Sequence, residues 1–187
     1  MDTEFPVGQI FACECSRAVG EQVFGTMDPT DVWVLIEYVK PWGNKAVPES
    51  DLPAAVKARL AEWEEQIPRL RVQLIRQRYA PQSGYRVFVA LSHETEPVLY
   101  QLTMQSYEAL MTLDLDAIRR RELRFNQQIT DKPIYAVCTN GRRDISCSKY
   151  GLPVFNALEP MALPQAWQTT HLGGHRFAGT MVILPHG

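Results

Sequence analysis

The chain has 187 residues, 45% of them hydrophobic, which supports one compact domain or two small packed units and excludes an intrinsically disordered protein. Its formal charge of -2 at pH 7, with Lys and Arg scattered among Asp and Glu, excludes the one-sided basic surface that nucleic-acid binding requires. No apolar run approaches the roughly 20 residues of a membrane span, and the first residues lack the pattern of a secretory signal, so we expect a cytoplasmic protein with no membrane partner.

Strand and helix patterns alternate through the first 125 residues. Residues 32–38 are nearly all apolar, which predicts a strand buried on both faces. Apolar residues then recur at helical spacing from Leu52 to Ile67, and Pro68 ends this predicted helix. The remaining predicted elements of this half are strands over 69–77, 85–91 and 97–103 and helices near 106–113 and 114–123.

A second round of the same order begins after residue 125. It comprises predicted strands over 133–138, 166–170 and 177–185 and a helix over 147–158. The two halves indicate a degenerate internal repeat of β-α-β-β units, in which the second copy stops one strand and one helix short. This order is that of a thioredoxin-like unit. We therefore predict a thioredoxin-like α/β fold, with an N-terminal half (1–125) that lacks the ligand residues and a C-terminal half (126–187) that carries them.

Four residues of metal-ligand type fall in two loops of the second half. Cys138 ends a predicted strand and Cys147 begins the following helix, while His171 and His175 lie between the last two strands. A β-α-β unit brings such loops to the same edge of the sheet, where α/β folds place their sites. Thiolate and imidazole together suit zinc and iron–sulfur clusters. The two glycines between the histidines allow tight curvature and close approach to a bulky group.

The spacing of these residues separates the alternatives. A C-x8-C pair is too wide for the cysteine knuckle of an ordinary zinc finger. In a Rieske site each cysteine stands next to a histidine in the sequence, which is not the case here. A structural zinc site in a non-catalytic binding module remains an alternative to an iron–sulfur centre. A thioredoxin-like thiol oxidoreductase is a weaker one, because no C-x-x-C motif is present.

The segments around these residues resemble the sucrase/ferredoxin-like family, also described as thioredoxin-like ferredoxins. The segments that carry the resemblance are 138–147, 149–153, 171–178 and 184–185, together with 15–21, 24–26 and 33–43. The resemblance therefore covers nearly the whole chain. It departs from the usual pattern of these ferredoxins at one point, because H-x3-H stands here in place of a C-x3-C pair.

This resemblance implies a bis-histidinyl [2Fe-2S] cluster, with Cys138 and Cys147 on one iron and His171 and His175 on the other. Such a centre transfers single electrons to or from a redox partner protein. Neutral imidazoles in place of thiolates raise the reduction potential. Reduction also makes the imidazoles more basic, so we expect proton uptake to accompany the electron.

The sequence favours an electron-transfer protein over a stand-alone enzyme, because it shows no nucleophile elbow, phosphate loop or paired carboxylates in register. Cys13 and Cys15 lie on a polar segment and are expected to be free thiols. The basic residues that flank the ligands are Arg142, Arg143, Lys149 and Arg176. They suit an acidic partner or hydrogen bonds to cluster sulfurs, with ordinary solvated charge as the alternative. The last predicted strand is a candidate sheet edge, which we expect the N-terminal half or a second copy to cover.

Overall fold

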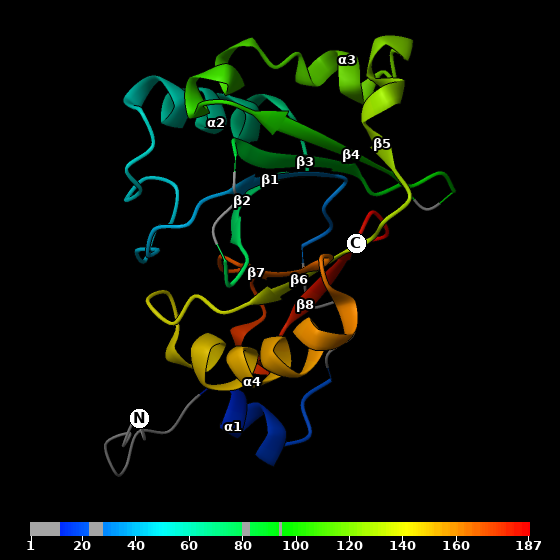
Figure 1. Ribbon diagram of the computed structural model, residues 1–187. Coiled ribbons are helices and arrows are strands. Elements are labelled where there is room, and N and C mark those ends of the chain that lie inside the picture. Colours follow the sequence, from blue (N-terminus) through cyan, green and yellow to red (C-terminus); the bar gives the residue numbers. More distant parts are fainter. Residues whose placement is uncertain (1–11, 23–27, 80–82, 94) are drawn as a thin grey trace.

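The computed structural model describes residues 12–22, 28–79, 83–93 and 95–187, and it shows a mixed α/β structure (Figure 1). Its described strands are β1 (Val32–Glu37), β2 (Leu70–Arg76), β3 (Tyr85–Leu91), β4 (Val98–Met104), β5 (Ile129–Thr130), β6 (Ile134–Cys138), β7 (Ala166–Thr169) and β8 (Met181–Leu184). The α-helices are α1 (Ala12–Ala18), α2 (Ala54–Gln66), α3 (Leu115–Arg119) and α4 (Ile145–Ala162). Short 3-10 helices are η1 (Tyr107–Thr112), η2 (Leu123–Gln128) and η3 (His175–Phe177).

Within the described residues the strands form one eight-stranded sheet in the order β5-β4-β3-β1-β2-β7-β6-β8. The internal repeat is visible in the pairing. β1 runs parallel to β2 across α2, and β6 runs parallel to β7 across α4. The next strand of each unit, β3 or β8, pairs antiparallel with the first strand of that unit. The predicted thioredoxin-like α/β fold class is confirmed. Antiparallel pairing of β2 with β7 joins the two units, and the division near residue 125 stays a prediction.

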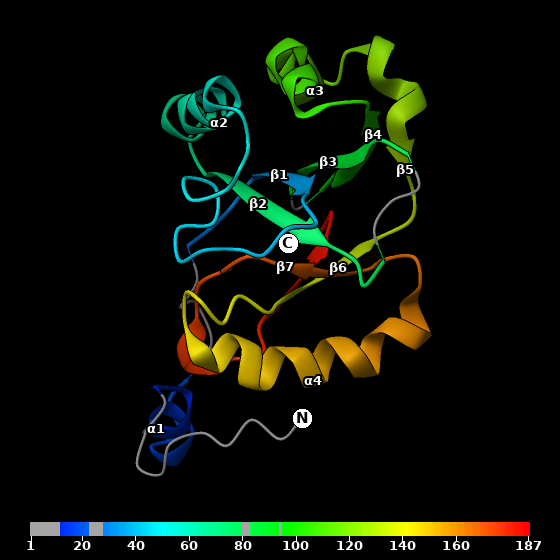
Figure 2. The same cartoon turned by 60° about the vertical axis from the view of Figure 1, so that its left-hand side comes forward.

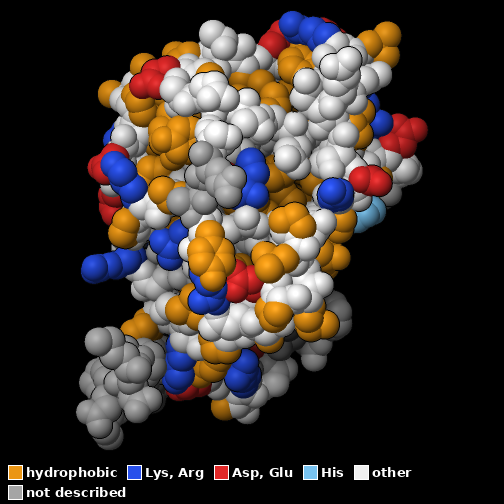
Figure 3. All heavy atoms as spheres, in the orientation of Figure 1, with side chains coloured by type: hydrophobic (Ala, Val, Ile, Leu, Met, Phe, Trp, Pro, Cys, Tyr) orange, Lys and Arg blue, Asp and Glu red, His pale blue; other side chains and the backbone are white. Residues whose placement is uncertain are grey.

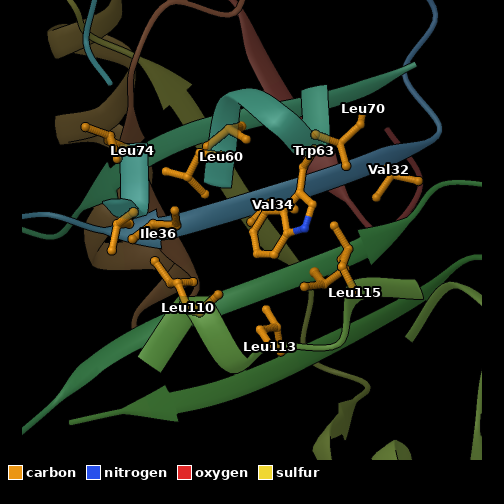
Figure 4. Packing of buried hydrophobic residues seen from close by; sticks show 14 of the residues in the cluster. Val32, Val34, Ile36, Leu60, Trp63, Leu70, Leu74, Leu110, Leu113 and Leu115 are labelled. Atoms are coloured by element: carbon orange, nitrogen blue, oxygen red, sulfur yellow. The ribbon is translucent and has the colours of Figure 1, made fainter. Parts of the chain in front are cut away.

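One face of the N-terminal strands packs against helices (Figure 4). Alternate residues of β1 point to this face because side chains alternate along a strand, and they include Val34 and Ile36. Leu60 and Trp63 of α2 cover them, and Leu110 of η1 joins the same cluster. Apolar burial of this kind is the main favourable term in folding.

The opposite face of the sheet forms a second core that both units share. Trp33 of β1, Ala136 of β6 and Trp167 of β7 belong to one cluster of buried residues. Phe88 of β3 contacts Trp167 with their rings 5.5 Å apart, although two strands separate β3 from β7 in the sheet. The sheet therefore curls around this core. Figures 1 and 2 show α2 and α3 on one side of the curled sheet and α4 on the other.

Several elements differ from the sequence-based expectation, and three of them bear on the site or the core. α4 begins at Ile145, earlier than predicted, because the Asp144 side chain caps it by accepting a hydrogen bond from the backbone N–H of Ser146 at 2.8 Å. The predicted helix near 106–113 is the 3-10 helix η1. The predicted strand 177–185 shortens to β8, because Phe177 belongs to the 3-10 helix η3 and the chain enters the sheet only afterwards.

The edge of the sheet at β8 is only partly covered. Met181 and Ile183 on this strand are 39% and 38% exposed. A cleft of about 570 Å³ lies between β8 and the N-terminal unit, and its lining includes Asp31, Arg69 and Met181. Among the described strands only β6 pairs with β8, so covering of this edge by a second copy stays a prediction. None of the helices in the described segments is long and apolar enough to span a membrane.

Candidate metal centre

The β-α-β arrangement of β6, α4 and β7 brings three of the four expected ligand residues together. Cys138 ends β6, Cys147 lies in the first turn of α4, and His171 follows β7. Their two sulfur atoms and one imidazole nitrogen all lie within 4.8 Å of one another. The Cys147 Sγ and the His171 Nδ1 are 3.4 Å apart. The backbone of His175 lies in η3, but its side chain is outside the described part of the chain, so its ligand role stays a prediction.

Close packing of α4 on β6 sets the distance between the two cysteines. Gly151 of α4 lies against the end of β6, where a Cβ atom added to it would be 2.0 Å from the Cys138 carbonyl oxygen. No side chain fits in that space. Glycine usually weakens a helix interior, but Gly151 is the residue that lets α4 approach the end of β6.

Positive backbone angles shape the turn that carries the histidines. Gly173 and Gly174 have φ values of +92° and +60°, which side-chain-bearing residues rarely adopt. A Cβ atom added to Gly173 would meet no described atom within 4 Å. Conformation rather than crowding therefore calls for glycine at position 173.

The N-terminal unit contacts both loops that carry the Cys/His group. The Arg71 guanidinium donates to the Leu172 carbonyl at 2.7 Å, and the Gln73 amide donates to the His171 carbonyl at 3.4 Å. On the other loop, the Asn140 amide donates to the Gly43 carbonyl at 3.2 Å. Further bonds join Thr170 to Gln73 and to the backbone of Leu74. Sequence reasoning missed these contacts.

These contacts depend on where β2 lies in the sheet, which the sequence pattern alone does not give. Arg71 and Gln73 alternate with apolar residues, as on a strand with one wet face. β2 is instead central in the sheet, between β1 and β7, so both of its faces are covered. Gln73 is buried, with 4% of its surface exposed. Buried polar side chains need partners, and here the ligand loop supplies them.

The environment favours one thiolate in the pair of cysteines. The hydrogen bond from the Cys147 thiol, followed by those from His171 and from the backbone of Leu172 and Asn140, lowers the pKa of Cys138 and outweighs the opposing effect of burial. The same bond, together with burial and the neighbouring thiolate, raises the pKa of Cys147. Both side chains are almost fully buried. Because the thiolate is the metal-binding form of cysteine, the lowered pKa favours Cys138 as a candidate metal ligand.

The N-terminal helix α1 lies beside the centre. The Cys13 side chain is buried against Ala178, with Ile145 and Tyr150 next to it, whereas Cys15 is exposed. Both are free thiols, as the sequence predicts. The Glu14 carboxylate accepts hydrogen bonds from Lys149 and Tyr150 at 2.8 and 2.7 Å, which anchors α1 to α4.

The flanking basic residues have different surroundings. Arg143 donates to the Asn44 side chain at 2.9 Å, and Arg176 pairs with Glu21 at 3.1 Å. Arg142 is exposed in the loop between the two cysteines. Arg143 and Arg176 therefore interact with Asn44 and Glu21 rather than with the thiols.

A curled sheet built from two β-α-β-β units, with a buried Cys/His group at the strand-to-helix corner of the second, defines a thioredoxin-like α/β protein with a candidate metal centre. The family model described as sucrase/ferredoxin-like matches residues 23–187, and the chain belongs to this family. Over 100 residues the chain is 30% identical to a protein of Meyerozyma guilliermondii named "Altered inheritance of mitochondria protein 32". That alignment spans 49% of this chain and about a third (33%) of the relative's length. No solved structure matches the chain significantly.

Proposed function

We propose that this protein binds a [2Fe-2S] cluster through Cys138, Cys147, His171 and His175 and transfers single electrons to or from a redox partner protein. The observation that carries the proposal is the convergence of two buried cysteine sulfurs and an imidazole nitrogen within 4.8 Å. Membership of a family described as sucrase/ferredoxin-like supports it.

The chemistry of the donor set fits this cofactor. Thiolate and imidazole are ligands for iron–sulfur clusters, including those in which histidines replace two cysteines. Backbone groups of Leu172 and Asn140 hydrogen-bond to Cys138, and such bonds tune the potential of a bound cluster. When bound, the cluster supplies one-electron redox chemistry.

The residues of this chain orient and shield the centre. Arg71 and Gln73 hold the loop of His171 by its backbone carbonyls, which positions the backbone that carries the imidazole. Burial of Cys138 and Cys147 keeps water from the thiols. The Arg71 guanidinium also interacts electrostatically with Cys138, so it favours added negative charge at the site.

Metal and sulfide analysis of anaerobically purified protein tests the proposal. We expect about two irons and two acid-labile sulfides per chain, with a visible absorbance that bleaches on reduction. Cys147→Ser should abolish loading. Cys15→Ser, which changes an exposed thiol on α1, should leave loading intact. Equal loading of the two variants would contradict the proposed ligand set.

A structural zinc site is the second candidate, and one distance favours it. The 3.4 Å between the Cys147 sulfur and the His171 nitrogen is close to the roughly 3.5 Å between two ligands of one tetrahedral zinc ion. The same analysis separates the candidates. One zinc per chain with no sulfide, in protein never exposed to oxygen, would assign the site to zinc and remove electron transfer.

The cellular compartment is a further part of the proposal. The sequence predicts a cytoplasmic protein, whereas the name of the relative refers to mitochondria. We propose the cytoplasm, and fractionation of cells that produce the tagged full-length protein tests it. Recovery in the mitochondrial fraction would overturn this assignment and leave the cluster proposal unchanged.

A further inference from the structure

Two adjacent hollows run along one side of α4, and we call them together the α4 groove. The first, of about 670 Å³, is lined by Arg142 and Lys149 among others. The second, of about 500 Å³, is lined by residues that include Arg76 and Arg78. Both hollows have Leu152 and Asn156 of α4 in their linings, so they adjoin at these two residues.

The α4 groove is basic. No Asp or Glu is among the residues that line either hollow. Lys149 pairs with Glu14 and Arg78 pairs with Glu159, both at 2.8 Å, which partly compensates those two charges. The positive charge that remains comes from Arg76 and Arg142.

Arg76 and Arg142 have no carboxylate partner among the described residues. The half-buried Arg76 guanidinium stacks over the Trp42 ring at 4.2 Å and donates to the Gln168 side chain at 3.4 Å. Arg142 is exposed, and no described residue forms an ion pair with it. In a chain with a net charge of -2, two uncompensated guanidinium groups in one groove mark a site for negative charge.

The groove also exposes apolar surface. Leu152 is 38% exposed and Val39 is 42% exposed, and each contributes to its lining. Figure 3 shows Lys and Arg side chains beside hydrophobic ones over the part of the surface where α4 lies. An apolar centre with a charged rim is the usual anatomy of a protein–protein contact.

The position of the groove connects it to the candidate metal centre. Gly141 and Arg142 lie in the loop that joins Cys138 to the helix, and Ser148 follows Cys147 in α4. A molecule in the groove therefore lies against the loop that joins the two cysteines and against the first turns of α4.

We propose that the α4 groove docks an acidic, partly apolar segment of the redox partner protein, an inference that rests on the proposed electron transfer. Arg76 and Arg142 attract and orient the acidic side chains, and Leu152 and Val39 receive the apolar ones. Docking here places the partner at the cysteine side of the centre.

Binding of a labelled peptide of alternating Glu and Leu residues to the loaded, full-length protein, measured by fluorescence anisotropy, tests this inference. We expect binding that weakens with added salt. The double variant Arg76→Glu and Arg142→Glu should bind at least about tenfold more weakly, because like charges then oppose the peptide. The matched control is Arg119→Glu and Arg120→Glu, an equal charge reversal at α3, which should bind as the unchanged protein does.

Several outcomes would overturn the inference. These are equal binding by the two double variants, equal binding of a Gln–Leu peptide, tighter binding of a short single-stranded DNA, or a dimer that the Arg76/Arg142 reversal dissociates. Iron content is measured on the same samples. Failure of these tests in a protein that contains the cluster would contradict the docking site and leave the proposed function standing. Absence of iron and sulfide would contradict the proposed function, whatever the peptide binding shows.

Discussion

The two β-α-β-β units use the same corner of the fold in different ways. The residue that ends the first strand is fully buried in both units, Glu37 on β1 and Cys138 on β6. Glu37 is paired with Arg86, whose guanidinium nitrogens lie 2.6 and 2.9 Å from the two carboxylate oxygens. Cys138 is instead faced by Cys147 and His171. Both units therefore place an ionisable side chain at this buried corner. In the first unit Arg86 neutralises it, and in the second unit it faces side chains that can bind a metal.

The support between the units runs from the first to the second. Arg71 and Gln73 on β2 bind the carbonyls of the His171 loop, and Gly43 accepts a bond from the loop that follows Cys138. In the N-terminal unit an ion pair occupies the strand-to-helix corner, and this unit supports the loops of the second unit. Variants at the Cys138 corner should therefore change the properties of the centre, whereas variants at the Glu37 corner should change stability.

The largest expected effect is on the potential at the Cys138 corner. His171→Cys replaces a neutral ligand with a thiolate, and the added negative charge opposes reduction. We expect the potential to fall from the range of histidine-ligated centres, about -150 to +300 mV, toward the roughly -400 mV of all-thiolate centres. A redox titration followed by visible absorbance measures it. His93→Cys, in a loop outside the group, is the control, and an unchanged potential in His171→Cys would remove this histidine from the ligand set.

A change at the corner of the N-terminal unit should lower the stability of the fold. Glu37→Ala leaves the Arg86 guanidinium without its buried partner, which we expect to lower the free energy of unfolding by about 3 kcal/mol. Urea unfolding measures this loss. Lys40→Ala breaks the exposed pair with Asp51 near the same strand end and should have no measurable effect. Similar losses in both variants would show that burial does not distinguish the two ion pairs.

A smaller effect is expected where α4 meets β6. Gly151→Ala brings a methyl group against the Cys138 carbonyl, so helix and strand must separate. We expect a loss of about 1–3 kcal/mol in unfolding free energy together with reduced iron loading. Ala157→Gly, at an exposed position of α4, should cost about 1 kcal/mol and keep normal loading. Full loading of Gly151→Ala would show that the cysteine geometry tolerates the shift.

Much of this comparison could be predicted from the sequence. The periodicity that gives β1 to β4 and the order β6-α4-β7 are local features, and the β-α-β rule then brings Cys138, Cys147 and His171 to one edge. The steric role of Gly151 could not be predicted, because it depends on contact between two elements. Neither could the packing of α1 beside the centre, since its short polar sequence shows no clear period.

The supporting role of β2 was missed for a related reason. Alternation of polar and apolar residues predicts a strand but does not tell which face meets water. Arg71 and Gln73 reach the His171 loop because β2 pairs with β7 of the second unit.

The smallest expected effect tests Arg71 itself. Its guanidinium both holds the Leu172 carbonyl and interacts electrostatically with Cys138. Arg71→Lys keeps the positive charge and loses the planar fork, whereas Arg71→Gln loses the charge as well. If the charge favours the reduced centre, Arg71→Gln should lower the potential by on the order of 50 mV, close to the one-electron tenfold step, and Arg71→Lys should stay near the original value. If Arg71 only holds the loop, both variants lose loading alike and the protein that remains loaded keeps its potential. Redox titration and iron content measured on the same samples therefore tell whether the N-terminal unit supplies charge to the centre or only a scaffold.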